Sequence, residues 1–298
     1  MSKLFNMKTL KTYSSCILLL FFLISYSSLA QIDLHVSSNA NTYIFVDGDG
    51  FADQSAGATN AALFVTDGIN LAGANSFIYL RDGAQLLQSN ESAFNSGLGQ
   101  LSVYQWGTVD EYQYNYWGSP VGNTTANNTA NRNFIPNNNI YDLVAAPITS
   151  NIAGFTTGYE GTSAPLVISE RWIWSFSPGE VYADWDFVGD GSGANGGSGI
   201  VTPGYGFTMK GTDAAGPSQL YDFRGKPNTG QMNVNVLAPV AGNPQWTLAG
   251  NPYASAIDMV DFFHDATANN GAVMSQILFW EHNSTGSHFL EDYVGYFR

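Results

Sequence analysis

Three aspartates lie close together in the segment FVDGDGFADQ, at positions 47, 49 and 53. Carboxylate oxygens are the ligands that Ca²⁺ prefers, so Asp47, Asp49 and Asp53 are candidate calcium ligands. The segment is not an EF-hand loop, because the fifth and twelfth positions counted from Asp47 hold Phe51 and Ala58. Asp-Gly pairs also favour tight turns, since glycine adopts positive φ and aspartate bonds to nearby backbone. A plain turn between strands is therefore the alternative interpretation.

A second acidic stretch, VYADWDFVGDGSGANGGSG, contains Asp184, Asp186 and Asp190 beside Trp185, ahead of a glycine-rich loop. Two functional interpretations fit it. The three carboxylates are candidate calcium ligands, and the indole ring of Trp185 is a candidate platform for stacking on a sugar ring. The alternative is a solvated hairpin loop, because acid-rich loops commonly do no more than face water.

The sequence offers no recognisable catalytic constellation. A glycosidase needs two carboxylates that face each other across a cleft, and sequence alone does not pair the acids available. The motif GSGANG matches a dinucleotide-binding pattern but lacks the helix that must follow it, and no G-x-S-x-G motif or phosphate-binding loop occurs. We therefore predict that the protein is not an enzyme, and calcium is the one cofactor that the sequence suggests. The unpaired acids are Glu160, Glu170, Glu180, Asp184, Asp186 and Asp190.

The first thirty residues have the pattern of a secretory signal peptide. A lysine-containing start is followed by an apolar run and by small residues, with a predicted cut after Ala30. The apolar run is shorter than the roughly 20 residues of a transmembrane helix, so we expect no membrane span in the mature chain. The chain ends at Arg298 inside a predicted strand, which we interpret as truncation of a longer protein.

The mature chain is strongly acidic. The first thirty residues hold three of the ten basic residues and none of the 24 acidic ones, so residues 31–298 carry a formal net charge of −17. Such a surface repels nucleic acid, whose binding depends on basic side chains. The single cysteine, Cys16, lies in the predicted signal peptide. Disulfides and cysteine-ligated metals are therefore excluded from the mature chain.

Residues 31–120 contain a weak repeat. The segments YIFVDGDG, ALFVTDGINL, FIYLRDGAQLL and LSVYQWGTV each alternate apolar and polar residues before a turn that often contains Asp-Gly. Ile44, Leu63, Ile78 and Leu101 lead the four units. Alternation of this kind predicts strands with one buried face, and their repetition predicts a short β-solenoid-like region. An antiparallel meander is the alternative.

Residues 121–298 have a different pattern, in which short aromatic-rich segments are divided by turn residues. The predicted strands are RWIWSF, GYGFTMKG, LYDFRG, QMNVNVL, WTLAGNPY, ILFWEH and YVGYFR. So many short strands favour a β-sandwich-like region. One short helix is expected in SAIDMVDFFHDA, with Ser255 as its N-cap. The fold class predicted for the whole chain is thus all-β, with a boundary near residue 120.

Several segments resemble a recurrent pattern in exported proteins of the Bacteroidota associated with type IX secretion. They are LSVYQWGTVDEYQYNYWGSPVG, GYGFTMKGT, YDFRGKPNTG, WTLAGNPYASAID and ILFWEHNSTGSHFLEDYVGYF. The chain departs from the pattern at Gly118, where serine is frequent, and at Ala254, where proline is frequent. The resemblance implies a secreted or cell-surface β-rich module, here without the C-terminal sorting domain, and it supplies no catalytic residues.

Together these features predict a non-catalytic structural or adhesin-like module, secreted or held on the outer surface of a Gram-negative bacterium. The expected partner is an extracellular surface, a glycan or a protein. The alternative function is a carbohydrate-binding or carbohydrate-degrading module of a larger secreted protein.

Overall fold

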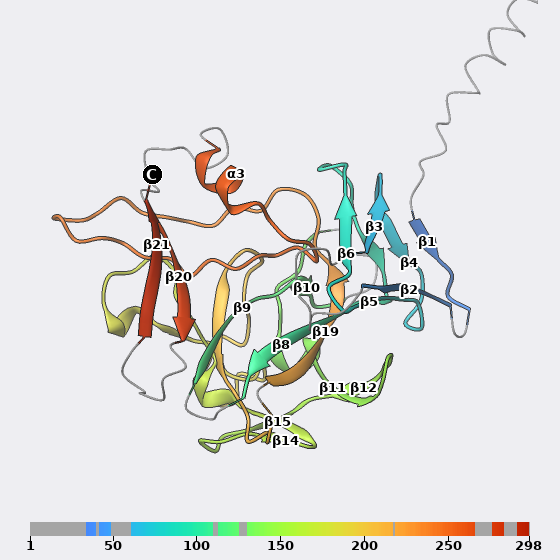
Figure 1. Ribbon diagram of the computed structural model, residues 1–298, viewed down its shortest axis with the longest axis horizontal. Coiled ribbons are helices and arrows are strands. Elements are labelled where there is room, and N and C mark those ends of the chain that lie inside the picture. Colours follow the sequence, from blue (N-terminus) through green and yellow to red (C-terminus); the bar gives the residue numbers. More distant parts are fainter. Residues whose placement is uncertain are drawn as a thin grey trace, which may run out of the picture.

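The computed structural model describes residues 34–39, 42–48, 61–109, 113–124, 130–216, 218–265, 276–282 and 291–297. The predicted signal peptide and the candidate ligands Asp49 and Asp53 lie outside these residues. Within them strands predominate, and the only α-helices are α2 (Pro136–Asn139) and α3 (Met259–His264). The predicted all-β class is therefore confirmed (Figure 1). None of the described helices is long and apolar enough to cross a membrane.

The first eight strands pair in parallel, in three separate ladders. They are β1 (Leu34–Val36), β2 (Tyr43–Asp47), β3 (Ala62–Val65), β4 (Ile69–Leu71), β5 (Phe77–Arg81), β6 (Gln85–Gln88), β7 (Ser96–Gly97) and β8 (Gln100–Thr108). The ladders are β1-β4-β7, β2-β5-β8 and β3-β6. These strands pair with one another in parallel, so they do not form the antiparallel meander.

The register shows which units of the repeat correspond. Ile44 pairs with Ile78, and Ile78 pairs with Leu101, so these three residues occupy one column of a single ladder. Leu63 instead pairs with Leu86 in another ladder. The sequence interpretation was wrong in counting Leu63 as the start of an equivalent unit. The reason is that Leu63 lies in β3, which belongs to a different ladder from β2. The two-residue alternation is the same in every strand, so it does not distinguish the ladders.

A seven-stranded mixed sheet joins the parallel strands to the rest of the chain. Its order is β12-β11-β19-β8-β5-β2, and β10 also pairs with β19. The added strands are β10 (Val121–Gly122), β11 (Ile140–Ala145), β12 (Thr149–Ile152) and β19 (Ser218–Pro227). Strand β19 pairs antiparallel with β8 from Ser218↔Thr108 to Gly225↔Leu101. Backbone hydrogen bonding is therefore continuous across the boundary predicted near residue 120.

The remaining strands form small sheets. They are β9 (Tyr114–Gly118), β13 (Gly154–Thr156), β14 (Thr162–Ser163), β15 (Leu166–Ser169), β16 (Trp174–Ser175), β17 (Asp186–Phe187), β18 (Gly206–Lys210), β20 (Gln276–His282) and β21 (Glu291–Phe297), with the 3-10 helices η1 (Glu170–Trp172) and η2 (Tyr182–Asp184). Strand β18 pairs with β9, and β20 with β21, both antiparallel. The sandwich-like arrangement of residues 121–298 stays a prediction.

Four local predictions were wrong. The segment QMNVNVL forms no strand, and WTLAGNPY contributes only isolated bridges, at Trp246 and Ala249. The segment RWIWSF begins with a 3-10 turn instead of a continuous strand. Helix α3 begins at Met259, because the carboxylate of Asp258, and not Ser255, accepts hydrogen bonds from the first backbone N–H groups. Aspartate is as good an N-cap as serine, so sequence did not distinguish the two.

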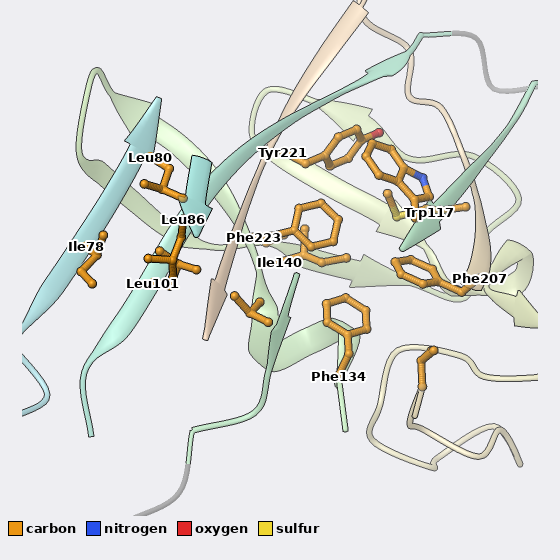
Figure 2. Close-up of a cluster of buried hydrophobic side chains, with 14 of the residues drawn as sticks. Ile78, Leu80, Leu86, Leu101, Trp117, Phe134, Ile140, Phe207, Tyr221 and Phe223 are labelled. Atoms are coloured by element: carbon orange, nitrogen blue, oxygen red, sulfur yellow. The ribbon is translucent and has the colours of Figure 1, made fainter. Parts of the chain in front are cut away.

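The core lies under one face of the mixed sheet. Alternate residues of β5, β8 and β19 point into it, and Ile78, Leu101 and Phe223 are fully buried. Figure 2 shows the aromatic part of this core around Phe134 and Phe207, whose rings stack with their centroids 4.9 Å apart. The side chains come from both sides of the predicted boundary and form one continuous cluster.

Two polar atoms of this core, Trp117 Nε1 and the Tyr221 hydroxyl oxygen, have no hydrogen-bond partner within the described residues, and the second supports a prediction. Tyr221 is fully buried against Trp117, and its hydroxyl makes no hydrogen bond within the described part of the chain. Because an unpaired buried hydroxyl costs free energy, we expect Tyr221→Phe to raise the free energy of unfolding by about 1 kcal/mol in urea titrations. The matched control is Tyr205→Phe, which removes the hydroxyl that accepts from Asn235 N and should lower stability. A loss of stability in Tyr221→Phe would contradict the prediction.

Candidate functional site

Asp47 ends strand β2 and lies directly beside the next Asp-Gly turn. It is paired with Arg81, and Asp82-Gly83 follows at once. Gly48 N donates to Arg81 O at 3.1 Å, and a Cβ on Gly48 would lie 2.0 Å from Asp82 O, so only glycine fits there. This geometry accounts for the first Asp-Gly pair as a turn stacked on its counterpart.

The turn also brings two carboxyl groups together. Burial, and after it the neighbouring Asp47 carboxylate, raise the pKa of Asp82. A bound cation would offset the repulsion between two such neighbouring carboxylates. Asp82 was missed as a candidate because the sequence does not reveal which turns stack.

The three acids of the second loop are used separately. Asp184 accepts hydrogen bonds from the backbone N–H groups of Glu180 and Val181, and these bonds lower its pKa. Asp186 accepts from Ser177 Oγ, and Asp190 accepts from Ser192 N at 2.7 Å. Each carboxylate therefore stabilises a local turn. In the part of the chain that the structure describes, no three His, Cys, Asp or Glu side chains are grouped to hold a metal.

Asp190 has a different acidic neighbour, Glu170. Glu170 is buried at the start of η1, and burial followed by the charge of Asp190 raises its pKa. The amide of Asn195 donates to Glu170 Oε1. Glu170 and Asp190 were among the carboxylates that sequence could not pair, and the structure pairs them. Their separation in sequence, across β16 and β17, explains why no motif indicated the contact.

Trp185, the candidate sugar platform, is half-buried. Its ring packs edge-on against Phe176, with 5.1 Å between the centroids. Trp174 similarly packs on Phe187, at 4.9 Å. Much of the surface of both indoles therefore contributes to local packing.

A partly exposed cluster of rings and cations lies on β9, β18, η1 and the loop after β13. We call it the cationic aromatic patch; its members are Tyr114, Tyr159, Arg171, Trp172 and Lys210. Lys210 Nζ lies 3.7 Å from the centre of the Trp172 ring, and the guanidinium of Arg171 lies 4.6 Å from that of Tyr159. The residues come from four elements, so no local sequence signal could have found the patch.

The face of the mixed sheet opposite the core is also aromatic. We call it the outer aromatic face; its members are Tyr43, Phe45, Phe77, Tyr79, Tyr104, Trp106 and Tyr141. Tyr43, Phe45 and Trp106 are 48%, 37% and 47% exposed. The rings of Phe77 and Tyr79 are stacked at 5.3 Å, and Tyr43 meets Tyr79 edge-on. Strand pairing places these rings on one side of the sheet, where Tyr79 is buried among them with 5% of its surface exposed.

The family model for a domain of unknown function, DUF8693, matches residues 54–296, which is more than half of the chain. The chain belongs to this family. The match extends across both regions predicted from the sequence. No curated protein and no solved structure gave a significant match.

In this DUF8693 domain, two buried cations lie on the same side of the sheet as the outer aromatic face, with Arg81 over the Tyr104 ring and Arg224 near the Tyr141 ring. Arg224 Nε donates to Asp222 Oδ2 at 2.7 Å. Arg81 is connected to the same carboxylate through a serine. Arg81 Nη2 donates to Ser102 Oγ, and Ser102 Oγ donates to Asp222 Oδ1. The turn after β11 is held by Arg81 Nε, which donates to Pro147 O. The network fixes the sheet and the turn that lies over it.

A buried lysine gives the DUF8693 domain a pH-dependent stability. Lys226 Nζ donates to Ala130 O at 2.8 Å, and burial together with Arg132 lowers the pKa of Lys226 to about 8. Between pH 8 and 10.5 the unfolded chain keeps this proton while the folded protein loses it, so stability rises with pH in that window. We expect the free energy of unfolding to rise, relative to Lys226→Met, by about 2 kcal/mol from pH 7 to pH 10. Urea titrations of both proteins at each pH measure this, and parallel pH dependences would contradict it.

Proposed function

We propose that the protein is exported and serves outside the cell as a non-catalytic structural or adhesin-like module. The exposed rings of Tyr43, Phe45 and Trp106 on the outer aromatic face carry this proposal, because exposed apolar side chains that lie on one face mark interaction sites. The signal-peptide pattern and the resemblance to exported Bacteroidota proteins support a location outside a Gram-negative cell, reached by type IX secretion. The three parallel ladders support a short β-solenoid for the first region, a form that presents extended binding surfaces.

The test uses the mature protein, residues 31–298, bound to whole cells and to surfaces coated with uncharged polysaccharide. We expect the double variant Tyr43→Ala/Trp106→Ala to bind at least tenfold more weakly than the wild type. The matched control is Phe64→Ala, because Phe64 is 76% exposed but lies on β3, in a different sheet. The proposal fails if the wild type binds neither target, or if the double variant binds as well as the wild type.

A carbohydrate-degrading function is the second candidate, and the Glu170–Asp190 pair favours it. A buried carboxyl group with a raised pKa beside a second carboxylate is the arrangement that glycosidases use for acid catalysis. Incubation with a panel of polysaccharides, followed by detection of new reducing ends, tests this function. Turnover that is lost in Glu170→Gln and kept in Glu160→Gln would establish it and overturn the non-catalytic proposal. Binding without turnover that is lost in Trp185→Ala would support the carbohydrate-binding alternative.

We also propose that calcium binds at the first acidic turn. The paired carboxyl groups of Asp47 and Asp82 favour this, and Asp49 and Asp53 are further candidate ligands. Binding to the folded state alone raises stability by RT ln(1 + [L]/Kd), or about 2.7 kcal/mol at a hundredfold excess over Kd. Thermal melting in calcium and in chelator measures the effect, and Asp47→Asn should abolish it. Identical midpoints for the wild type in both conditions would end this proposal.

A further inference from the structure

A loop of exposed apolar residues lies between β19 and α3. We call residues 235–244 the apolar loop; their sequence is NVLAPVAGNP, which contains no charged residue. Every residue of the loop is exposed, and Val236, Leu237 and Val240 are 43%, 50% and 58% exposed. Figure 1 shows this part of the chain in orange, projecting at the left of the view. Large apolar side chains exposed together on a projection mark an interaction site.

The apolar loop is ordered by its own hydrogen bonds. Thr247 Oγ1 donates to Asn235 O at 2.8 Å, which ties the two legs of the loop together. At the tip, Val240 and Asn243 exchange two backbone hydrogen bonds, of 3.0 and 2.9 Å. The two residues between them have φ values of 52° and 87°, and positive φ at both positions is typical of a type I′ turn. Because the loop is already ordered, little conformational entropy is lost when its side chains are buried.

A second exposed apolar segment lies beside the loop. Asn243 Nδ2 donates to Glu180 Oε1, which holds the two segments together. Directly after Glu180, Val181 and Tyr182 are 53% and 90% exposed. A tyrosine with an apolar ring and a polar hydroxyl suits the boundary between hydrocarbon and water. The loop and this segment therefore extend the exposed apolar surface over two parts of the chain.

A lipid surface fits this projection better than a protein partner does. A protein would need a groove shaped to a convex loop, whereas lipid headgroups move apart around it. Apolar side chains gain free energy when they leave water for the boundary between headgroups and acyl chains. The paired backbone groups of the turn reduce the number of polar groups that lose their water.

The charge of the protein selects the kind of lipid. Glu180 and Asp184, on either side of the second segment, are exposed carboxylates, and the mature chain carries a net charge of −17. An anionic lipid surface would repel such a chain. A zwitterionic headgroup has no net charge, and its ammonium group is attracted to the two carboxylates.

We propose that the apolar loop inserts into the headgroup region of a zwitterionic lipid surface, with Val236, Leu237 and Val240 at the boundary with the acyl chains. The contact is peripheral, and the chain does not cross the bilayer. This inference goes beyond the proposed adhesive function, and none of its residues belongs to the outer aromatic face.

The test measures co-sedimentation of residues 31–298 with vesicles of phosphatidylcholine or of phosphatidylglycerol. We expect binding to phosphatidylcholine vesicles, and at least tenfold weaker binding by Leu237→Asp and by Val240→Asp. The matched control is Phe64→Asp, which adds the same charge at a residue 76% exposed on β3 and should bind like the wild type. Phosphatidylglycerol vesicles should bind the wild type more weakly, because both are negatively charged.

A fluorescent label reports insertion directly. Residues 31–298 contain no cysteine, so Val240→Cys and Phe64→Cys each provide a single labelling site. The emission of an environment-sensitive dye at position 240 should shift to shorter wavelength when phosphatidylcholine vesicles are added. The same dye at position 64 should show no shift.

The outcomes separate this inference from the proposed function. No binding to phosphatidylcholine vesicles, equal binding by the wild type and both loop variants, tighter binding to phosphatidylglycerol, or unchanged emission at position 240 would overturn the inference. Tyr43→Ala/Trp106→Ala leaves the loop intact, so it should bind vesicles like the wild type. Adhesion that depends on Tyr43 and Trp106 would be unaffected by any of these results. Circular dichroism of each variant shows whether it is folded.

Discussion

Replacement of Asp222 by asparagine is expected to lower the free energy of unfolding by about 3–5 kcal/mol. The Asp222 carboxylate is fully buried between Arg224 and Ser102, and its second oxygen also accepts from Ser150 Oγ at 2.7 Å. Removing its charge leaves the guanidinium groups of Arg81 and Arg224 buried without an anion in their shared network. Burial already lowers the pKa of Arg81, which shows how poorly this environment solvates a cation.

Urea titrations measure this loss, and the midpoint should fall with little change in slope. The matched control is Asp186→Asn, because Asp186 is exposed and accepts a hydrogen bond from Ser177 only at the surface. We expect the control to change stability by no more than about 0.5 kcal/mol. If Asp222→Asn lost less than about 1 kcal/mol, the network would contribute far less than its burial indicates.

The sequence predicted the strand class and part of the repeat because both depend on local alternation. A period of two marks a strand wherever it occurs, so the segments of β5, β8 and β19 were found. Asp47-Gly48 and Asp82-Gly83 were correctly aligned as repeated turns, since glycine is required where Gly48 meets the backbone of Asp82. Alternation does not indicate which ladder a strand joins. This is why Leu63 was wrongly grouped with Ile44, Ile78 and Leu101.

The candidate sites were less predictable because their members are distant in sequence. Asp184, Asp186 and Asp190 are near neighbours in the chain, yet each carboxylate serves its own turn. Asp190 meets Glu170, twenty positions away, because η1 and the glycine-rich loop fold together. Lys210 reaches Trp172 because η1 lies beside β18, where Thr208 Oγ1 donates to Trp172 O, and no periodicity encodes this contact. Clustering in sequence was therefore a poor guide to clustering in space.

Strand β19 connects the two predicted regions within one sheet. It pairs with β8 on one side and β11 on the other, and its Phe223 ring packs on Trp117 and Phe134. Removing a fully buried phenylalanine leaves a cavity, so we expect Phe223→Ala to lower the free energy of unfolding by about 3–5 kcal/mol. Phe94→Ala, at a residue 63% exposed, should cost less than about 1 kcal/mol.

Because the sheet and its core are continuous across residue 120, we expect Phe223→Ala to lower the free energy of unfolding of both regions together. Fluorescence from the tryptophans and hydrogen exchange at the backbone of β5 and β19 should report the same transition in the wild type, and the same lowered stability in Phe223→Ala. If β5 kept its protection while β19 lost it, the parallel strands would be an independently stable unit. Their attachment through β8 would then add little to their stability, contrary to what the shared core indicates.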